Sequence, residues 1–490
     1  MELKKIISGI ENLKSKGSLD IDILNICNNS KEVKAGDLFI AIKGFVSDGH
    51  EYIEDAIKNG AKAIMIDLNS NIKGLKIPEN ITVIIAQNTR HAASICAINF
   101  YKNPSKNFKL IGVTGTKGKT TTTFMIKSIL EKQGRKVGLI GTIANYIGDK
   151  NLGNSERTTP ENLDLQKLFA QMAKEKVEVV VMEVASQSIK LDRVAGLTFD
   201  IGIFTNFSKD HISDREHPDM EDYFNCKVKL FEMSKIGYIN ADDRNVAKVK
   251  KLVPECEIFT YGIDNNCDIL AKDIIVTNSY VDFKVKIENR NERIKAGIPG
   301  RFSVYNSLAS ICIAGRLGCT ANEIREGLID IKVPGRSELV PNKKELNVMI
   351  DFAHTPESLE NILTAVKAYT KGKVISVFGC GGDRDPSKRP IMGEVSGRIA
   401  DFTIITSDNP RTEKPEEIVK QIEEGIKKGK GKYVCIVDRI EAIKYALKMA
   451  NKIDMIVLAG KGHEPYQEIH GKKYPFDERI IVNDLLNQQD

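Results

Sequence analysis

Phe108-Lys-Leu-Ile-Gly-Val-Thr114, followed at once by Gly115-Thr-Lys-Gly118-Lys119-Thr120-Thr121, is the stretch that decides the fold. An apolar strand leads through a glycine-rich turn into a helical pattern at Thr121–Lys132, which is the context that a P-loop requires. Glycines let successive backbone N–H groups face phosphate oxygens, and a helix N-terminus adds partial positive charge. Lys119 then suits the β- and γ-phosphates, and the Thr120 hydroxyl suits Mg²⁺. The alternative is a tight glycine turn that binds nothing.

Two further predicted strands end in polar residues. Val177-Glu-Val-Val-Val-Met-Glu183 ends in a carboxylate, and the strand at Phe199–Asn206 is followed by Asp210 and His211. Ligands of parallel sheets lie beyond the carboxyl ends of the strands. We therefore expect Glu183 to bind a metal or its water, with a solvated strand-end glutamate as the alternative. His211 either ligates a second cation or caps the next helix, and the spacing leaves both open.

Apolar β-branched runs alternate with helical patterns through most of the 490 residues, which predicts α/β architecture with parallel sheets. A chain of this length needs more than one hydrophobic core. We expect three domains, at residues 1–105, 106–333 and 334–490, with the P-loop in the second. The first domain ends at about residue 105 because Pro104 interrupts a helix that ends near Tyr101.

The strands expected in these blocks are Ala63–Leu68 and Ile81–Ala86 in the first, Gly237–Asn240 beside those named above in the second, and Asn347–Phe352, Lys373–Phe378, Phe402–Ser407, Tyr433–Val437 and Met455–Ala459 in the third. The third block reads as a doubly wound, Rossmann-like domain without the dinucleotide fingerprint. Residues 266–298 read as strands that form an excursion at the edge of the central sheet. A helix is expected at Ser303–Gly318.

Composition excludes several classes of protein. The chain carries 72 basic and 66 acidic residues, which is too even a balance for nucleic-acid binding. No run of apolar residues is long enough to span a membrane. Residues 1–17 lack the apolar core of a signal peptide, and the nine cysteines include no C-x-x-C pair, so we expect a reducing compartment and a cytoplasmic protein.

The ordered motifs of the chain together resemble the Mur ligase family, whose members build the peptide stem of bacterial cell-wall precursors. The matching stretches are Gly115–Thr121, Met182-Glu183-Val, Thr205-Asn206 with Asp210-His211, Val333-Pro-Gly-Arg336, Asp351-Phe-Ala-His354-Thr-Pro356, Gly379-Cys-Gly-Gly-Asp-Arg384-Asp, Asp408-Asn-Pro-Arg411 and Gly460-Lys-Gly-His-Glu464. The match covers nearly the whole chain in the right order. The last four stretches are similar to those of members that add the third residue of the stem peptide.

The resemblance implies a fold and a reaction. The expected fold is a central P-loop, parallel-sheet ATPase domain flanked by an N-terminal α/β domain that binds the UDP-linked substrate and a C-terminal Rossmann-like domain that binds an amino acid. The implied reaction uses ATP to phosphorylate the D-glutamate carboxylate of UDP-N-acetylmuramoyl-L-alanyl-D-glutamate, and an amine then attacks the acyl phosphate. A carboxylate is a poor electrophile, and Mg²⁺ and lysines would neutralise the charge that develops. We expect the chain to act as a monomer.

The family's functional residues map onto this sequence position by position. Catalytic and metal-binding roles fall on Lys119, Thr120, Glu183, His211 and Lys227, with Lys227 as a carbamate. ATP binding falls on Gly115, Thr116, Lys117, Gly118, Lys119, Thr120, Thr121, Asn306, Arg336 and Asp351, and binding of the UDP-linked substrate falls on Ser30, Thr158, Thr159, Ser186 and Arg193. An unmodified ammonium cannot ligate a cation, whereas a carbamate offers two oxygens. From the residues alone, Lys227 would be a solvated helix lysine.

The amino-acid site implied by the family comprises Arg384, Asp408, Asn409, Pro410, Arg411, Gly460 and Glu464. Arginine at the position of Arg411 accompanies meso-2,6-diaminopimelate in the family, and a guanidinium can hold the distal carboxylate of that amino acid bidentately. Glu464 suits its distal ammonium. As bare sequence, Asp408-Asn-Pro is equally a turn former.

Three other functions remain to be compared. The first is the same ligation with L-lysine, and the second is a ligase like folylpolyglutamate synthase, which shares the P-loop core but not the motifs at Asp408–Arg411 and Gly460–Glu464. The third is a catalytically silent, nucleotide-gated scaffold, which the retained charged residues of the site argue against because buried charges are costly unless used.

Overall fold

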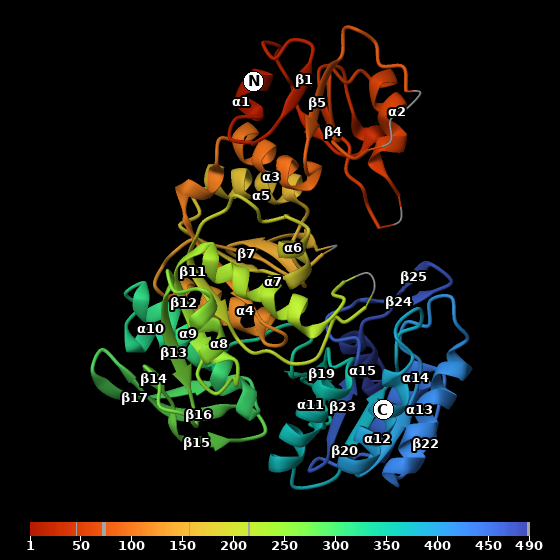
Figure 1. Ribbon diagram of the computed structural model, residues 1–490. Helices are drawn as coiled ribbons and strands as arrows, with labels where there is room; N and C mark the ends of the chain where they lie inside the picture. The colour runs from red at the N-terminus through yellow and green to blue at the C-terminus, as the bar shows by residue number, and fades with distance from the viewer. Residues whose placement is uncertain (46, 71–74, 156, 214–215, 488–490) are drawn as a thin grey trace. The chain divides into compact units, whose positions relative to one another are not determined.

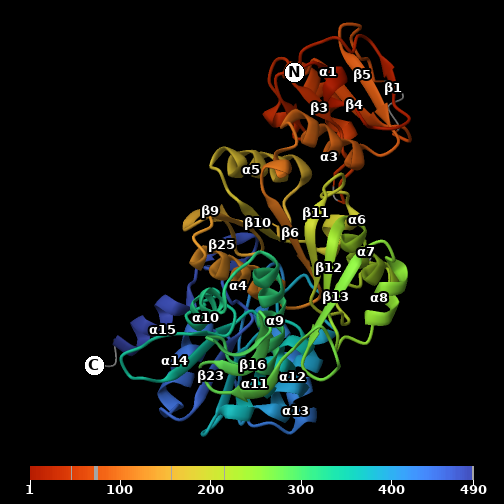
Figure 2. The same cartoon turned by 90° about the vertical axis from the view of Figure 1, so that its left-hand side faces the viewer.

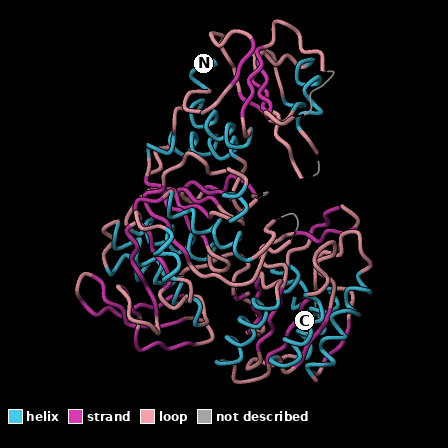
Figure 3. Tube along the Cα trace, in the orientation of Figure 1, coloured by secondary structure: helices cyan, strands magenta, loops and turns pink. Residues whose placement is uncertain are grey.

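The computed structural model describes residues 1–45, 47–70, 75–155, 157–213 and 216–487. Helices and strands alternate along the described chain (Figures 1 and 3), which confirms the predicted α/β class. Packing divides the chain into two compact units. The first unit comprises Met1–Ile269 and Ala309–Cys319, and the second unit comprises Leu270–Leu308 and Thr320–Asp490.

A five-stranded sheet organises the beginning of the first unit, in the order β1-β5-β4-β3-β2. Strands β2 to β5 run parallel, and β1 is antiparallel to β5. The first four residues of β4 are buried because helices cover both faces of the sheet. The elements are α1 (Leu3–Ile6), β1 (Lys14–Lys16), β2 (Ile26–Cys27), η1 (Ser30–Glu32), β3 (Leu38–Ile40), η2 (Gly49–Tyr52), α2 (Ile53–Lys58), β4 (Ala63–Asp67), β5 (Thr82–Ala86), α3 (Thr89–Phe100) and η3 (Pro104–Asn107).

Helix α3 ends where the sequence predicts. Its last residue is Phe100, Asn103 takes a left-handed conformation with φ of +49°, and Pro104 starts the short 3-10 helix η3. Helices α3 and α5 lie side by side (Figures 1 and 2), and the Asn162 side chain of α5 donates to the Ser94 hydroxyl of α3 at 3.1 Å. The five-stranded layer is thereby joined to the rest of the first unit.

A nine-stranded sheet forms the rest of the first unit, in the order β14-β13-β12-β11-β6-β10-β7-β8-β9. Strands β13 to β7 of this order run parallel, and β8 and β9 are antiparallel. Strand β6 lies between β10 and β11, so the carboxyl ends of these three strands meet at one edge. The elements are β6 (Lys109–Thr114), α4 (Lys119–Lys132), β7 (Val137–Ile140), β8 (Ala144–Ile147), β9 (Lys150–Asn154), α5 (Asn162–Lys174), β10 (Val179–Glu183), α6 (Ser186–Lys190), β11 (Phe199–Phe204), α7 (Met220–Glu232), β12 (Ser234–Asn240), α8 (Val246–Leu252), β13 (Glu257–Gly262) and β14 (Ile269–Leu270). Helix α9 (Arg301–Arg316) is divided between the units: residues up to Leu308 belong to the second unit and those from Ala309 to the first.

The segment at 266–298 differs from the prediction. Only β14 joins the nine-stranded sheet, whereas β15 (Lys272–Val276), β16 (Val281–Ile287) and β17 (Arg290–Ala296) form an antiparallel sheet of their own in the second unit. In β16 the apolar residues are buried, whereas Lys284 and Lys286 are exposed. A sheet with this pattern has its own apolar face to cover, and α10 (Ala321–Ile329) packs against β17.

A six-stranded sheet forms the larger part of the second unit, in the order β18-β19-β23-β20-β21-β22. All pairs are parallel except β18 with β19. The elements are β18 (Glu338–Leu339), β19 (Asn347–Asp351), α11 (Pro356–Tyr369), β20 (Val374–Phe378), α12 (Lys388–Ile399), β21 (Phe402–Ile405), α13 (Pro415–Gly429), β22 (Tyr433–Cys435), α14 (Arg439–Met449), β23 (Met455–Ala459), β24 (Tyr466–Ile469), β25 (Lys472–Pro475) and α15 (Glu478–Asn487). Strands β24 and β25 form a separate antiparallel hairpin.

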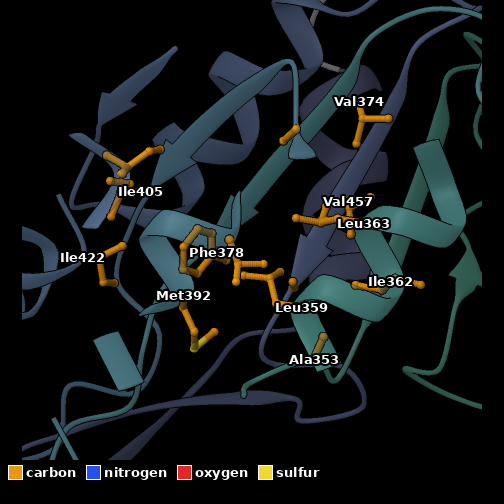
Figure 4. Close-up of a cluster of buried hydrophobic side chains, with 14 of the residues drawn as sticks. Ala353, Leu359, Ile362, Leu363, Val374, Phe378, Met392, Ile405, Ile422 and Val457 are labelled. Carbon is orange, nitrogen blue, oxygen red and sulfur yellow. The ribbon is translucent and has the colours of Figure 1, made fainter. Parts of the chain in front are cut away.

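Helices cover both faces of the six-stranded sheet, as a doubly wound domain requires. Phe378 and Val457 point toward α11 and α12, where Leu363 and Met392 complete one core (Figure 4). Ile375, Val377, Ile456 and Leu458 belong to the opposite core, with residues of α14 and α15. Successive strand residues alternate between two apolar cores, which explains the near-continuous apolar runs of the sequence. The predicted Rossmann-like architecture is confirmed.

Within the described ranges, no helix combines the length and apolar character needed to cross a membrane.

Candidate active site

The glycine-rich loop lies between β6 and α4, as the sequence predicts. Gly115 and Gly118 take φ values of +141° and +84°, which favour glycine. A Cβ atom on Gly115 would lie 1.9 Å from the Thr205 hydroxyl oxygen, so no larger residue fits there. Lys119 begins α4 and its ammonium donates to the Gly115 carbonyl at 2.8 Å. The lysine side chain therefore lies over the loop that is expected to hold phosphates.

Asn206 and Thr205, at the end of β11, support this loop. The Asn206 side chain accepts from the Lys117 N–H at 2.9 Å and donates to the Lys117 carbonyl at 3.0 Å, and the Thr205 hydroxyl donates to the same carbonyl at 2.6 Å. The Lys117 ammonium pairs with Asp210 at 2.9 Å. The Thr205 and Asn206 side chains thus hold the backbone of the phosphate loop at Lys117.

Glu183 ends β10, and its side chain is completely buried. Its carboxylate accepts from the Thr120 hydroxyl at 3.0 Å, and from the Thr142 N–H and hydroxyl at 2.8 and 3.0 Å. The carboxylate is therefore surrounded by hydroxyl and amide groups at the strand ends, and the solvated alternative is wrong. Thr142 was not predicted from the sequence, although it lies two residues after the end of β7, a strand next to β10.

Lys227, on α7, is buried rather than solvated. Its side chain is 1% exposed, and its ammonium donates to the Gly115 carbonyl at 2.8 Å and lies 4.5 Å from the centre of the Tyr223 ring. Burial, reinforced by the nearby Lys119 ammonium, lowers the pKa of Lys227 well below its ordinary value. The neutral amine is the form of lysine that combines with carbon dioxide. This environment therefore favours a carbamate.

His211 does not cap the next helix. Helix α7 begins at Met220, and its cap is Asp219, whose side chain accepts from two backbone N–H groups of the first turn. The His211 ring lies 2.7 Å from the Glu216 carboxylate, and its side chain is 45% exposed. The hydrogen bond from His211 is the main cause that lowers the pKa of Glu216. The imidazole is thus held at the sheet edge, within reach of solvent.

Thr158, Thr159, Ser186 and Arg193 gather around the end of β10. The Thr158 hydroxyl lies 3.1 Å from that of Thr142, and the Thr159 hydroxyl donates to the Glu183 carbonyl at 2.9 Å. Arg193 donates to the Thr159 carbonyl at 3.3 Å. The fifth predicted residue, Ser30, lies elsewhere: it is buried in η1 of the five-stranded layer, where Asn59 donates to its carbonyl at 2.9 Å.

His217 is a residue that the sequence analysis missed. Its ring is fully buried, with Nε2 at 2.9 Å from the Ser186 hydroxyl and Nδ1 at 2.7 Å from the Asp222 carboxylate. Burial lowers the pKa of His217, and Asp222 opposes this shift. The only sequence signal was a second histidine shortly after His211. The Ser186 hydroxyl is thus hydrogen-bonded to a buried imidazole.

Three predicted nucleotide residues belong to the second unit. Asn306 is buried in α9. Arg336 stacks its guanidinium on Phe352, 4.6 Å from the ring centre. Asp351 ends β19 and accepts from the Ser337 N–H at 2.7 Å, and burial raises the pKa of the Asp351 carboxyl while Arg336 opposes the rise. Arg336 and Asp351 thus form one charged cluster at a strand end.

The predicted amino-acid residues come together at the carboxyl ends of β20, β21 and β23. A Cβ on Gly460, where φ is +115°, would lie 2.5 Å from an Asp408 carboxylate oxygen. The Asn409 side chain donates to Glu464 at 2.8 Å. Burial raises the pKa of the Glu464 carboxyl. Asp408 and Asn409 are buried, so this segment is a structured site and more than a surface turn.

The two arginines of this cluster lie beside the loop after β20. Arg411 takes a left-handed conformation with φ of +50°, and its Nη1 donates to the Gly382 carbonyl at 2.7 Å. A Cβ on Gly381 would lie 2.9 Å from Arg411 Nη1 and 3.8 Å from Arg384 Cγ. The exposed Arg384 and the partly buried Arg411 therefore approach the same backbone. Pro410, between Asn409 and Arg411, is buried.

Lys461 is the third residue, after Thr142 and His217, that was not predicted from the sequence. Its side chain is fully buried, and its ammonium donates to the Asn409 side-chain oxygen at 3.0 Å and lies 3.6 Å from Glu464. Because the oxygen of the Asn409 amide is occupied, its nitrogen faces Glu464. A lysine between two glycines of a loop gave no signal of such burial.

The chain is similar to known proteins along its whole length. Three family models match the chain: the Mur ligase family catalytic domain over residues 22–99, the Mur ligase middle domain over residues 113–314, and the Mur ligase glutamate ligase domain over residues 335–462. Two curated relatives are UDP-N-acetylmuramoyl-L-alanyl-D-glutamate–2,6-diaminopimelate ligases. That of Caldanaerobacter subterraneus is 48% identical over the full length of both chains, and ligase 1 of Clostridium acetobutylicum is 45% identical, also over both full lengths. A solved structure of a ligase with the same name is 27% identical, covers 100% of this chain and 99% of its own, and superposes with a TM-score of 0.70.

Proposed function

Because this chain belongs to the Mur ligase family, we propose that it uses ATP to join meso-2,6-diaminopimelate to UDP-N-acetylmuramoyl-L-alanyl-D-glutamate, with release of ADP and phosphate. This reaction is a step of peptidoglycan synthesis. The observation that carries the proposal is the full-length similarity to two diaminopimelate ligases, in a chain that keeps the charged residues of the site.

The first chemical step activates the D-glutamate carboxylate. ATP lies with its phosphates on the loop Gly115, Thr116, Lys117, Gly118, Lys119, Thr120 and Thr121. Lys119 stabilises the charge that develops on the transferred phosphoryl group. Its ammonium is partly buried and donates to the loop carbonyls of Gly115 and Thr116, which supports this role because a charge partly shielded from water acts more strongly than one in water.

Mg²⁺ is the proposed cofactor. Thr120 and Glu183 would hold a first ion, His211 would hold a second, and Lys227 would contribute as its carbamate. The residues fit the ion. Glu183 and Thr120 offer oxygen ligands and are hydrogen-bonded to each other. The lowered pKa of Lys227 favours the carbamate, whose oxygens could also ligate the ion. When bound, Mg²⁺ neutralises phosphate charge during the transfer.

Substrate binding is assigned to the remaining residues of the site. Thr158, Thr159, Ser186 and Arg193 bind the muramoyl dipeptide, and Ser30 binds part of the uridine nucleotide. Asn306, Arg336 and Asp351 hold the base, phosphates and ribose of ATP. Two contacts support the first assignment: Thr158 contacts Thr142, and Thr159 donates to the Glu183 carbonyl. These residues therefore lie beside the proposed metal ligand Glu183, where the reacting carboxylate must also lie. Ser186 contacts His217.

The amino acid is bound by Arg384, Asp408, Asn409, Pro410, Arg411, Gly460 and Glu464. The Arg411 guanidinium would hold the distal carboxylate of diaminopimelate, and Glu464 its distal ammonium. L-Lysine lacks the distal carboxylate, so the proposed contact with Arg411 gives diaminopimelate the advantage.

The test is an assay of ADP release with a panel of acceptors and amino acids. We expect release to require the muramoyl dipeptide, with a kcat/KM for meso-diaminopimelate well above that for L-lysine. Release with a folate acceptor would favour the folylpolyglutamate synthase alternative. Release with L-lysine but not with diaminopimelate would make L-lysine the amino acid that is added. No release with any pair of acceptor and amino acid would support the scaffold.

Three further properties belong to the same proposal. The domain boundaries are 1–105, 106–333 and 334–490, which limited proteolysis would test. The chain acts as a monomer, which light scattering would test. It works in the cytoplasm, as the free cysteines among the described residues support, and cell fractionation would test this.

A further inference from the structure

The hairpin β24–β25 lies against the turn that carries the proposed amino-acid site. The Arg411 N–H donates to the Glu468 carbonyl at 3.1 Å, and the His470 N–H donates to the Arg411 carbonyl at 2.7 Å. The Glu468 N–H donates to the Asn409 side-chain oxygen at 2.9 Å. These bonds fix the hairpin in register on the turn, so the position of the Glu468 backbone is set relative to Arg411.

Glu468 also contacts the Arg411 side chain. Arg411 Nε donates to the Glu468 carboxylate at 3.1 Å, while Nη1 donates to the Gly382 carbonyl on another edge of the guanidinium. The group is thus held through two of its three nitrogens. Among the described residues, Nη2 of Arg411 makes no hydrogen bond.

We propose that Glu468 is a positioning and specificity-determining residue for the amino acid, acting through Arg411. The inference rests on the proposed function, because it concerns how the guanidinium recognises a distal carboxylate. Glu468 holds the planar group in one orientation, and that orientation is what a bidentate carboxylate requires. An amino acid without a distal carboxylate gains nothing from it.

Glu468 could instead compete with the substrate carboxylate for the guanidinium. The position of the contact argues against this, because Glu468 occupies only Nε, and bonds from its backbone to Asn409 and Arg411 keep it beside that nitrogen. A residue fixed in this way stays beside Nε when the substrate binds at the other nitrogens. The two roles predict opposite changes in the KM for diaminopimelate.

The experiment measures kcat and KM for meso-diaminopimelate, L-lysine and ATP in the full chain. We expect Glu468→Ala to raise the KM for diaminopimelate about tenfold, the effect of one weakened charge-assisted hydrogen bond, with kcat within about twofold. Glu468→Gln keeps an acceptor and should raise it about threefold. The KM for L-lysine and for ATP should not change. Lys472→Ala is the matched control, because Lys472 is exposed on the other strand of the same hairpin.

A double substitution separates a role through Arg411 from a general loss of structure. In the Arg411→Ala background, Glu468→Ala should cause no further rise beyond about twofold, because the partner is gone. If Glu468→Ala fails to fold, as circular dichroism would show, the threefold rise in Glu468→Gln carries the test.

Several outcomes would overturn the inference. The first is a KM for diaminopimelate that stays unchanged or falls in both Glu468 variants. The second is a KM for L-lysine that rises as much as the KM for diaminopimelate. The third is a further tenfold rise of the KM for diaminopimelate when Glu468→Ala is added to Arg411→Ala. With an active wild-type enzyme, these results leave the proposed function intact. A wild-type chain that releases no ADP with diaminopimelate would overturn both.

Discussion

Replacing Arg439 with methionine is expected to destabilise the second unit by about 3–5 kcal/mol. Arg439 and Glu478 form an ion pair with side chains only 0% and 1% exposed, and Nε and Nη2 of the arginine both lie 2.8 Å from one carboxylate oxygen. Methionine fills a similar volume but leaves the Glu478 charge buried without its partner. The loss is therefore much larger than that of a surface pair.

The same substitution should reach the amino-acid site. Arg439 donates to the Ser407 carbonyl at 3.3 Å and to the Ala459 carbonyl at 3.0 Å, and these residues directly precede Asp408 and Gly460. Each lost bond costs about 1 kcal/mol. We expect the KM for diaminopimelate to rise in Arg439→Met, with the KM for ATP changed less.

Two variants calibrate this effect. In Arg439→Met with Glu478→Leu, both charges are gone, and most of the stability should return. Lys452→Met is the matched surface control: Lys452 and Glu345 also form an ion pair, but their side chains are 67% and 76% exposed. Its loss should cost less than about 1 kcal/mol.

Hydrogen exchange is the suitable assay, because the sequence contains no tryptophan to report unfolding by fluorescence. The slowest amides of β21 and β23 should exchange about a hundredfold faster or more in Arg439→Met, since about 1.4 kcal/mol corresponds to a factor of ten. Equal exchange in Arg439→Met and Lys452→Met would refute the reasoning. So would a double variant that is less stable than Arg439→Met.

Three further outcomes are expected. Lys119→Ala should lower kcat for ADP release at least a hundredfold, and normal turnover would contradict the proposed phosphate loop, with the exposed Lys132→Ala as control. Burial raises the pKa of Glu464, so its carboxyl gains a proton and loses its charge in less acidic solution than an ordinary glutamate does. The KM for diaminopimelate should therefore rise as the pH is lowered, and a similar rise in Glu464→Gln would exclude this carboxyl as the cause. His217→Ala should raise the KM for the muramoyl dipeptide about tenfold and change kcat less. If the variant with both His217→Ala and Ser186→Ala has the same KM as His217→Ala, His217 acts through Ser186; a further tenfold rise would contradict this.

The sequence determined the features that depend on neighbouring residues. The loop from Gly115 to Lys119 needs a strand, two glycines and a helix in direct succession, and all of these are contiguous. Strand-end residues such as Glu183 and Asp408 could be placed at a ligand-binding edge because parallel strands present their carboxyl ends together. The alternation of apolar runs and helical patterns sufficed for the fold class. It did not suffice for residues 266–298, because period-two patterning shows a strand but not which sheet the strand joins.

Only the tertiary structure decided which side chains meet. Strand β7 lies next to β10, and this order brings Thr142 to Glu183. The burial of Lys227 follows from the packing of α7 against the phosphate loop, and its lowered pKa follows from that burial. Likewise, the contact of Glu468 with Arg411 depends on a hairpin that pairs with a turn far away in sequence. Hydrogen bonds and desolvation act over a few ångströms in space, whatever the separation along the chain, so these contacts cannot be read from local sequence.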